Sequence, residues 1–438
     1  MKNHYFKNNI YISIYSNQGE VLIKIKIPYG QEYVDLDVTV PHEIIVPKNV
    51  KVGNESEIIK QALEEPIGMD SFAIFARKSN KLLILVNDAT RPTPTSKVLK
   101  ELYPLLKGHP DVKFLIATGA HRGPTEEELR YIFAEFLDEF RSKIHVHDAR
   151  MDEDMTYLGE SSNGTEMHLN KLVTETKNIL VIGSVEPHYF AGYTGGRKSF
   201  LPGVAAYRTI EMNHMHALSD MAAPLALQGN PVAEDMEDAM KVLKDLHVFS
   251  IQTVLTADHG LYAMIAGDLK LSFELAVKKA NEVFCPSCNR RGNIVLTVAP
   301  YPMDIDLYQS QKALENGKLA LEHGGIIILV SKCRDGIGDD TFLKLLCCAQ
   351  TSEDVMQKIS EGYKLGYHKA AKMVQIGMHA QMWAVSDLDT DTLKKARLKP
   401  HTDLQETFDK AIAATRAAGK EPYVVILPQG SLTVPLVK

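Results

Sequence analysis

The chain has 438 residues, of which 45% are hydrophobic and 24% charged, values that are usual for a globular protein and exclude a largely disordered one. The formal net charge is −6, so no global positive field would attract nucleic acid. The first residues lack a leader-like apolar core, and no run of about 18 apolar residues would span a membrane. We therefore expect a cytoplasmic protein with neither a nucleic-acid nor a membrane partner.

A chain of this length exceeds a typical single core, so we expect two domains. Apolar and polar residues alternate around a polar turn within residues 10–30, which predicts an N-terminal β-hairpin. Short apolar strands and amphipathic helices then take turns. The expected strands cover residues 81–88, 112–121, 178–186, 293–300, 324–332 and 423–430, and the expected helices cover 95–107, 125–140, 207–221, 231–246 and 354–366.

Alternation of this kind indicates parallel sheets with helices on both faces. The pattern breaks at residues 281–293, where we place the domain boundary. The prediction is an α/β fold of two Rossmann-like domains, residues 1–285 and 286–438, with the active site in the cleft between them. In open α/β sheets, ligands bind where loops leave the carboxyl ends of the strands. Three consecutive strand ends deliver polar side chains to one expected rim, namely Asp88, Arg91, His121, Arg122, His188, Arg197 and Lys198.

The last of these loops contains the stretch GYTGGRKS, which superficially resembles a phosphate-binding loop. The comparison fails because Arg197 stands where that loop needs glycine, and Pro202 would shorten the following helix. Gly195 and Gly196 still allow close approach of the backbone to a ligand, although a plain surface turn would explain them as well. The adjacent basic pair, which includes Lys198, favours ligand contact.

His121 and His188 follow different strands, so they could face each other across a ligand. Each alone would be an ordinary surface histidine, but as a pair they suit acid–base chemistry on two sides of a stereocentre. His214 and His216 are two apart on a predicted helix and point in different directions, so at most one serves the same site. Either could instead face solvent, and one imidazole could complete a metal site whose other ligands come from a cofactor.

In the second domain, Tyr308, Gln309 and Lys312 follow the strand at residues 293–300. Gln309 and Lys312 are three apart and share a helix face, where Lys312 could bind a carboxylate or simply be solvated. Trp383, the single tryptophan, is expected in the core.

The chain has five cysteines, and Cys285 and Cys288 have the spacing of half a zinc site or a redox pair. No second such pair follows in the sequence. We therefore favour incidental thiols over a metal or redox site.

Five motifs, NDATRPTP, ATGAHRG, EPHYFAGYTGGRKSFLPG, NHMHAL and DIDLYQSQKAL, occur in an order that resembles the lactate racemase family. Members of that family invert 2-hydroxy acids with a nickel-pincer nucleotide. The resemblance implies that the cofactor, the nickel complex of pyridinium-3,5-bisthiocarboxylic acid mononucleotide, is attached to Lys198, that nickel is bound by His214, and that His121 and His188 are catalytic. It also implies the following contacts: Asp88, Arg91, Gly195 and Gly196 with the cofactor, and Arg91, Tyr308, Gln309 and Lys312 with the substrate.

The implied reaction removes the α-hydrogen as hydride, which avoids a carbanion beside a carboxylate. One histidine takes the hydroxyl proton, and the other returns a proton after the keto acid has turned. Arg91 and Lys312 would hold the carboxylate. Lactate is the default substrate, and malate, phenyllactate, 2-hydroxyglutarate and aldonates stay open.

Other readings are a Schiff base between Lys198 and pyridoxal phosphate, two histidines acting on a bare acid, or a non-enzymatic regulator that binds a nucleotide or anion. The expected partners are a small 2-hydroxy carboxylate and the cofactor maturation proteins. We expect a monomer or a homodimer.

Overall fold

The structure is a computed structural model that describes residues 2–7, 10–17 and 20–438. The chain folds into two compact units, one formed by residues 50–283 and the other by residues 1–49 together with 284–438. The expected boundary near residue 285 thus coincides with the junction. The first 49 residues, which were expected in the N-terminal domain, belong instead to the C-terminal unit.

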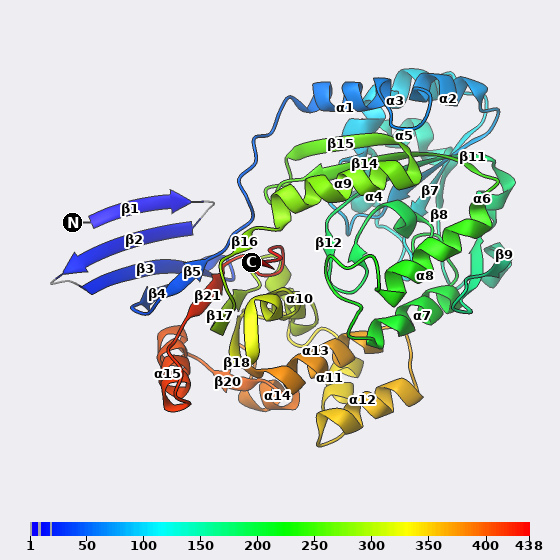
Figure 1. The fold of residues 1–438 in the computed structure, drawn as a ribbon. Coiled ribbons are helices and arrows are strands. Elements are labelled where there is room, and N and C mark those ends of the chain that lie inside the picture. Colours follow the sequence, from blue (N-terminus) through cyan, green and yellow to red (C-terminus); the bar gives the residue numbers. More distant parts are fainter. Residues whose placement is uncertain (1, 8–9, 18–19) are drawn as a thin grey trace. The chain divides into compact units, whose positions relative to one another are not determined.

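A six-stranded sheet forms the centre of the unit of residues 50–283 (Figure 1). All neighbouring strands are parallel except the edge strand β15, which is antiparallel to β14. In spatial order the strands are β15 (Leu261–Asp268), β14 (His247–Leu255), β11 (Asn178–Ser184), β6 (Leu82–Asn87), β7 (Val112–Ala117) and β8 (Ile144–Val146). The sequence had predicted β6, β7 and β11 but not the pair β14–β15.

The helices of this unit are α1 (Glu55–Glu64), α2 (Phe72–Lys78), α3 (Thr95–Lys107), α4 (Glu126–Phe133), α5 (Leu137–Phe140), α6 (Lys171–Glu175), α7 (Tyr207–Met215), α8 (Pro231–Ala239) and α9 (Leu269–Phe284), which crosses into the other unit. Two antiparallel strand pairs, β9 (Met155–Glu160) with β10 (Glu166–Asn170) and β12 (Pro187–His188) with β13 (Gly192–Tyr193), complete it. The helix expected over residues 125–140 is interrupted, because Ala134 adopts a φ of 47°.

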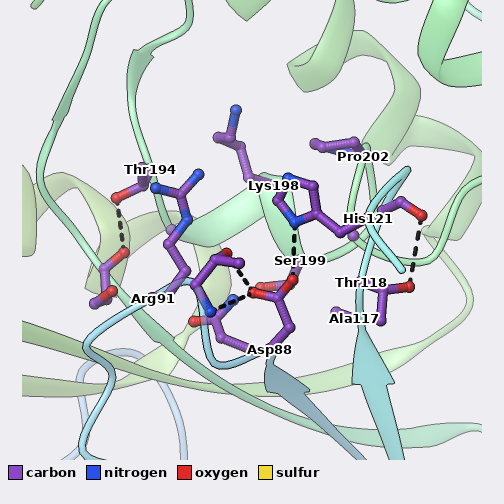
Figure 2. A pocket seen from close by; sticks show the side chains of 15 residues that line it. Asp88, Arg91, Ala117, Thr118, His121, Thr194, Lys198, Ser199 and Pro202 are labelled. Atoms are coloured by element: carbon purple, nitrogen blue, oxygen red, sulfur yellow. Dashed lines mark hydrogen bonds and ion pairs between the residues drawn. The ribbon is translucent and has the colours of Figure 1, made fainter. Parts of the chain in front are cut away.

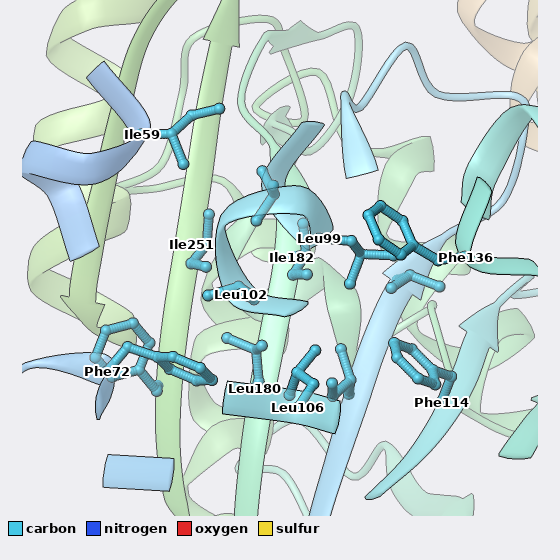
Figure 3. Close-up of a cluster of buried hydrophobic side chains, with 14 of the residues drawn as sticks. Ile59, Phe72, Leu99, Leu102, Leu106, Phe114, Phe136, Leu180, Ile182 and Ile251 are labelled. Atoms are coloured by element: carbon cyan, nitrogen blue, oxygen red, sulfur yellow. The ribbon is translucent and has the colours of Figure 1, made fainter. Parts of the chain in front are cut away.

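The strands are buried on both faces, as their continuous apolar runs predicted. Ile84 and Val86 of β6 belong to one buried cluster with Leu99 and Leu102 of α3. Figure 3 shows Leu99 and Leu102 in this cluster. Leu85, between them in sequence, points to the opposite face and is also buried. A sheet covered on both sides exposes only its strand ends and edges to ligands.

The second unit also contains a six-stranded sheet, and all its strands are parallel. The order is β20 (Lys399–His401), β19 (Gln381–Val385), β18 (Leu321–Val330), β17 (Gly292–Val298), β21 (Val424–Leu427) and β5 (His42–Ile44). Its helices are α10 (Leu307–Gly317), α11 (Asp340–Leu346), α12 (Ser352–Glu361), α13 (Tyr367–His379), α14 (Thr390–Lys395) and α15 (Leu404–Ala417), and β16 (Ser287–Cys288) pairs with β22 (Leu436–Val437).

The N-terminal segment joins this unit through backbone pairing and a shared core. Strands β1 (Lys2–Lys7), β2 (Ile10–Asn17), β3 (Glu20–Tyr29) and β4 (Glu32–Val38) form an antiparallel meander that contains the predicted hairpin. β5 then extends the parallel sheet beside β21. Ile25 and Leu36 are fully buried in one cluster with Ile294 and Leu296, which explains why the segment leaves the neighbouring unit.

In each sheet, the strands that follow one central strand in the sequence lie on both sides of it. From β6 the chain continues to β7 and β8 on one side, while β11 lies on the other. From β17 it continues to β18, with β21 on the other side. Such switch points are where α/β sheets bind ligands, because the loops diverge there. Among the residues that the structure describes, no helix is both long and apolar enough to cross a membrane.

Candidate active site

A pocket opens at the switch point between β6 and β11 (Figure 2). It is built from the loops after β6, β7 and β11, as the sequence predicted. Its lining residues are Asn87, Asp88, Thr90, Arg91, Ala117, Thr118, Gly119, His121, Ser184, Thr194, Gly195, Lys198, Ser199, Pro202 and Gly203. Five of the predicted site residues, Asp88, Arg91, His121, Gly195 and Lys198, therefore share one pocket.

The loops after β6 and β7 meet in a hydrogen bond between Asp88 and His121. Nδ1 of His121 donates to Oδ2 of Asp88 over 2.8 Å. The other carboxylate oxygen accepts the hydroxyl of Thr90 over 2.6 Å. Burial alone would raise the pKa of Asp88, but these hydrogen bonds and the His121 charge lower it below its ordinary value. Asp88 thus stays ionised and orients His121 with its lone pair on Nε2.

Arg91 is held beside this pair by an acidic residue from the loop after β11. Its Nη1 lies 3.3 Å from Oε1 of Glu186, and both side chains are largely buried. Sequence reasoning gave Glu186 no role, although it precedes His188 in the same motif. The sequence did contain a signal for this pair: Arg91 and Glu186 carry opposite charges and follow β6 and β11, the two strands that flank the switch point.

The glycines of the loop after β11 are required by protein packing rather than by a ligand. Gly195 has a φ of 79°, and a Cβ there would lie 2.5 Å from Val185 and 2.6 Å from Gln252. A Cβ on Gly196 would lie 2.8 Å from the ring of Phe273. The amide of Gly196 donates to Oε1 of Gln252 over 2.9 Å. Gly195 lines the pocket and Gly196 does not, so only Gly195 stays a candidate for cofactor contact.

Lys198 is partly buried at the end of this loop, in a short 3-10 turn over Gly196–Ser199. Burial lowers the pKa of its amine well below the ordinary value, and the positive charges of Arg91 and Arg197 lower it further. A lowered pKa increases the fraction of the amine that is uncharged and therefore nucleophilic at a given pH. Lys198 is therefore suited to covalent attachment of a cofactor.

Three predicted site residues surround the ring of Phe190. The imidazole of His188 lies edge-on to it at 4.6 Å between ring centroids, and that of His214 at 5.0 Å. The ammonium nitrogen of Lys198 lies 5.6 Å from the same ring. Phe190 itself is buried. This ring links Lys198 to both histidines.

The tautomer of His188 differs from that of His121. Nδ1 of His188 accepts the backbone N–H groups of Ala191 over 3.2 Å and Phe190 over 3.5 Å. A neutral ring that accepts at Nδ1 carries its proton on Nε2. His121 therefore presents a lone pair at Nε2, whereas His188 presents an N–H.

Two residues expected on the rim serve other purposes. Arg122 is exposed and forms a two-pronged ion pair with Glu128, at 2.7 and 2.8 Å, at the start of α4. Arg197 is buried against the ring of Phe273, at 4.9 Å, with its pKa lowered to about 10 by burial. Neither side chain lines the pocket. Sequence proximity to the strand ends could not distinguish them from Arg91.

The structure distinguishes His214 from His216. His214 lies in α7 and is buried, with Nδ1 donating to Oδ1 of Asn213 over 3.1 Å. His216 follows the end of the helix and is more exposed. Among the described residues, no three His, Cys, Asp or Glu side chains come together as a metal site. A metal at His214 would therefore need donors from a cofactor.

Tyr308, Gln309 and Lys312 lie in α10 of the other unit, as predicted. They occupy its partly exposed side, and the helix begins at the switch point after β17. The amine of Lys369 lies 3.5 Å from the ring centroid of Tyr308. Burial raises the pKa of Tyr308 to about 12, so its hydroxyl stays neutral. The expectation that these residues face the pocket across a cleft stays a prediction.

The remaining predicted residues are structural. Trp383 is buried in the core of its unit, as expected. Cys285 and Cys288 are buried, and burial raises the pKa of their thiols to about 12 and about 11. Thiols with such values are weak nucleophiles and poor metal ligands at neutral pH. This agrees with incidental cysteines.

Comparison with known proteins accounts for most of the chain. Residues 29–225 match the lactate racemase N-terminal domain and residues 288–434 match the lactate racemase C-terminal domain. The lactate racemase of Thermoanaerobacterium thermosaccharolyticum is 33% identical over 350 residues, covering 77% of this chain and 81% of that protein. The lactate racemase of Lactiplantibacillus plantarum is 30% identical over 390 residues, covering 86% and 90%.

Solved structures agree. The lactate racemase apoprotein from T. thermosaccharolyticum superimposes with a TM-score of 0.86 and 29% identity, over 95% of this chain and all of that one. A protein from Thermotoga maritima matches with a TM-score of 0.65 and 17% identity, over 87% of this chain and 98% of that one, which shows the fold alone. Both family domains and two relatives of 33% and 30% identity over most of the chain lead to one conclusion. The chain belongs to the lactate racemase family, and racemases are isomerases.

Proposed function

We propose that this protein inverts C2 of a 2-hydroxy carboxylate, with lactate as the first substrate to test. His121 and His188 act on the substrate hydroxyl, and a nickel-pincer nucleotide attached to Lys198 completes the site. The relatives described as lactate racemases support the choice of substrate class. Malate, phenyllactate, 2-hydroxyglutarate and aldonates are the alternative substrates.

The observation that carries the proposal is that the two imidazoles carry their protons on different ring nitrogens. Racemisation needs a base that takes a hydroxyl proton and a donor that stabilises the oxygen of the keto acid. His121 offers a lone pair at Nε2, because Asp88 occupies its Nδ1–H. His188 offers an N–H at Nε2, because backbone amides occupy its Nδ1. In this arrangement His121 is the base, and His188 changes role only if its contacts with those amides break.

The residues present fit the implied cofactor. Lys198 supplies an amine whose pKa is lowered by burial, which favours the uncharged form that acylation requires. His214 supplies one buried imidazole, and nickel in a square-planar site accepts such a donor beside sulfur ligands. Phe190 contacts both side chains, which supports their action at one site.

Held by Lys198 and His214, a nickel-pincer nucleotide would supply the hydride-accepting and hydride-donating chemistry at C2. The protein's residues do the rest. Arg91, oriented by Glu186, binds the substrate carboxylate by charge-assisted hydrogen bonds. His121 takes the hydroxyl proton on Nε2, and Asp88 stabilises the imidazolium that results. His188 donates a hydrogen bond from Nε2 to the developing carbonyl oxygen, and the proton held on Nε2 of His121 returns to that oxygen when the hydroxy acid re-forms.

Chiral chromatography tests this proposal directly. Protein produced with the cofactor maturation proteins is incubated with single enantiomers of lactate and of the four alternative acids, and appearance of the opposite enantiomer is measured. We expect His121→Ala and His188→Ala each to lower turnover by about 10²- to 10⁴-fold. His145→Ala, on β8 and outside the pocket, is the matched control and should keep full turnover. Near-normal racemisation by both His121→Ala and His188→Ala would contradict the assignment of the two histidines.

Mass spectrometry separates the proposal from its rivals. A cofactor adduct on the peptide containing Lys198, with nickel and sulfur present, is the expected result. A pyridoxal adduct, or an unmodified lysine in active protein, would favour the other two enzymatic readings. Absence of turnover on every acid, together with tight nucleotide binding, would favour a regulator.

A further inference from the structure

A buried chain of polar side chains lies behind His214. Its Nδ1 donates to Oδ1 of Asn213, and Asn213 in turn donates from Nδ2 to Oδ2 of Asp235 over 2.7 Å and to the carbonyl of Val232 over 3.3 Å. Asn213 and Asp235 are fully buried, and His214 is nearly so. The three residues come from two adjacent helices, α7 and α8.

The orientation of the Asn213 amide follows from its partners. The Asp235 carboxylate and the Val232 carbonyl can only accept hydrogen bonds, so the NH2 group of Asn213 must face them. Its carbonyl oxygen then faces His214, and an oxygen can only accept. The proton of the neutral imidazole is therefore placed on Nδ1, with the lone pair on Nε2.

Asp235 is in turn fixed by two hydroxyl groups from the loop between β9 and β10. Ser161 donates to its Oδ1, and Thr165 donates to its Oδ2 over 2.8 Å. A buried carboxylate with three donors leaves little freedom to rotate. The ring of Phe190 packs edge-on against His214 and limits rotation of the imidazole from another side.

We propose that Asn213, oriented by Asp235, is a positioning residue that holds His214 in the tautomer able to bind a metal through Nε2. The inference rests on the proposed role of His214 as the nickel ligand. Histidine ligands commonly donate their second N–H to such a partner, and loss of the partner typically lowers metal affinity about 10- to 100-fold. Here the partner is an amide, and the carboxylate lies one step behind it.

The first measurement needs no metal. Imidazole ¹⁵N chemical shifts of the apoprotein report which nitrogen carries the proton, and the His214→Gln variant assigns the signal. We expect the Nδ1–H form in the natural protein. Asn213→Leu, which has nearly the same shape but no acceptor, should give a mixture of tautomers. Asn213→Ala replaces it if leucine is not accommodated, and thermal unfolding confirms that each variant is folded.

Exchanging the amide and the carboxylate between positions 213 and 235 tests whether the tautomer of His214 can be restored. In the double variant Asn213→Asp/Asp235→Asn, the new carboxylate accepts from His214 and from the amide at position 235, so the buried charge and the acceptor for His214 are kept, whereas the hydrogen bonds to the Val232 carbonyl and from Thr165 are lost. We expect it to restore the Nδ1–H tautomer. Asp238→Asn is the matched control, because Asp238 lies on the same helix but accepts its hydrogen bonds from Ser162 and Lys241. It should leave the tautomer unchanged.

The second measurement is nickel retained per covalently bound cofactor after dialysis against a chelator. We expect a loss of about 10- to 100-fold in affinity for Asn213→Leu and retention in the reciprocal variant and in Asp238→Asn. A natural tautomer in Asn213→Leu, or failure of the exchange to restore it, would overturn the positioning role. Natural protein that carries cofactor but no nickel would instead refute the proposed function and leave the tautomer result standing.

Discussion

Asp88 and His121 lie at the ends of the neighbouring parallel strands β6 and β7 and are joined by a hydrogen bond of 2.8 Å from Nδ1 to Oδ2. Only 10% of the Asp88 side chain is exposed, whereas 56% of His121 is. A buried acceptor thus orients an accessible imidazole. Because Asp88 is buried, it holds His121 in place. Because His121 is exposed, solvent and substrate can reach its imidazole.

Asp88→Asn should abolish most activity without unfolding the protein. The amide can donate to Nδ1 and reverse the tautomer of His121, so the lone pair at Nε2 is lost. We expect kcat to fall by about 10²- to 10⁴-fold, measured by chiral chromatography. Asp138→Asn, in α5 and outside the pocket, is the control and should keep kcat. Equal kcat values for Asp88→Asn and Asp138→Asn would show that the Asp88–His121 hydrogen bond is not needed for catalysis.

The Asp88–His121 pair also predicts how the free energy of unfolding changes with pH. Because the folded-state pKa of Asp88 lies below its ordinary value of about 3.9, its contribution is present above that value and is lost as the pH falls through the folded-state pKa. Urea unfolding of the natural protein and Asp88→Asn between pH 6 and about 3 measures it. We expect the difference in unfolding free energy to shrink at the acidic end. A constant difference would show that the pKa is not lowered.

Lys198 should react with amine reagents at a lower pH than other lysines. Its pKa lies well below the ordinary value, so a larger fraction is uncharged near neutral pH. Competitive labelling of the apoprotein with trace acetic anhydride from about pH 6 to 10, followed by peptide mass spectrometry, gives a rate profile for each lysine. The profile of Lys198 should be displaced to lower pH relative to exposed Lys100. Identical profiles would contradict an uncharged amine.

Arg91→Lys should weaken substrate binding more than turnover. Lysine keeps the charge but lacks the planar fork that can engage a carboxylate while pairing with Glu186. Loss of one charge-assisted hydrogen bond, worth about 1.5–3 kcal/mol, predicts a rise in KM of about tenfold or more. Arg122→Lys is the control, because Arg122 binds Glu128 outside the pocket. An unchanged KM in Arg91→Lys would place the carboxylate elsewhere.

The cysteines near residue 285 should be inert. With thiol pKa values of about 12 and about 11, Cys285 and Cys288 should not react with a disulfide reagent at pH 8 in the folded protein. Exposed Cys347 should react first, and the two buried thiols only after denaturation. The variants Cys285→Ser and Cys288→Ser should retain nickel and activity. Loss of nickel from either variant would support the alternative that Cys285 and Cys288 bind a metal.

Local patterns in the sequence predicted the central strands β6, β7, β11, β17, β18 and β21 and the helices α3, α4, α7, α8 and α12. The antiparallel pair β14–β15 was missed because Ser250, Gln252 and Thr253 interrupt the apolar run of β14. The helix over residues 125–140 was expected to be continuous, since its apolar spacing continues past the break at Ala134. Neighbouring packing, not local propensity, decided both features.

The sequence by itself determined the α/β class, the loops that carry the chemistry, and the motifs that relate the chain to its family. Those properties follow from residue types and spacing along one strand or helix. The tertiary structure alone decided that residues 1–49 join the C-terminal unit, that Glu186 orients Arg91, and that Arg122 and Arg197 point elsewhere. It also decided the unlike tautomers of His121 and His188, because each proton is placed by a hydrogen-bond partner that only folding supplies.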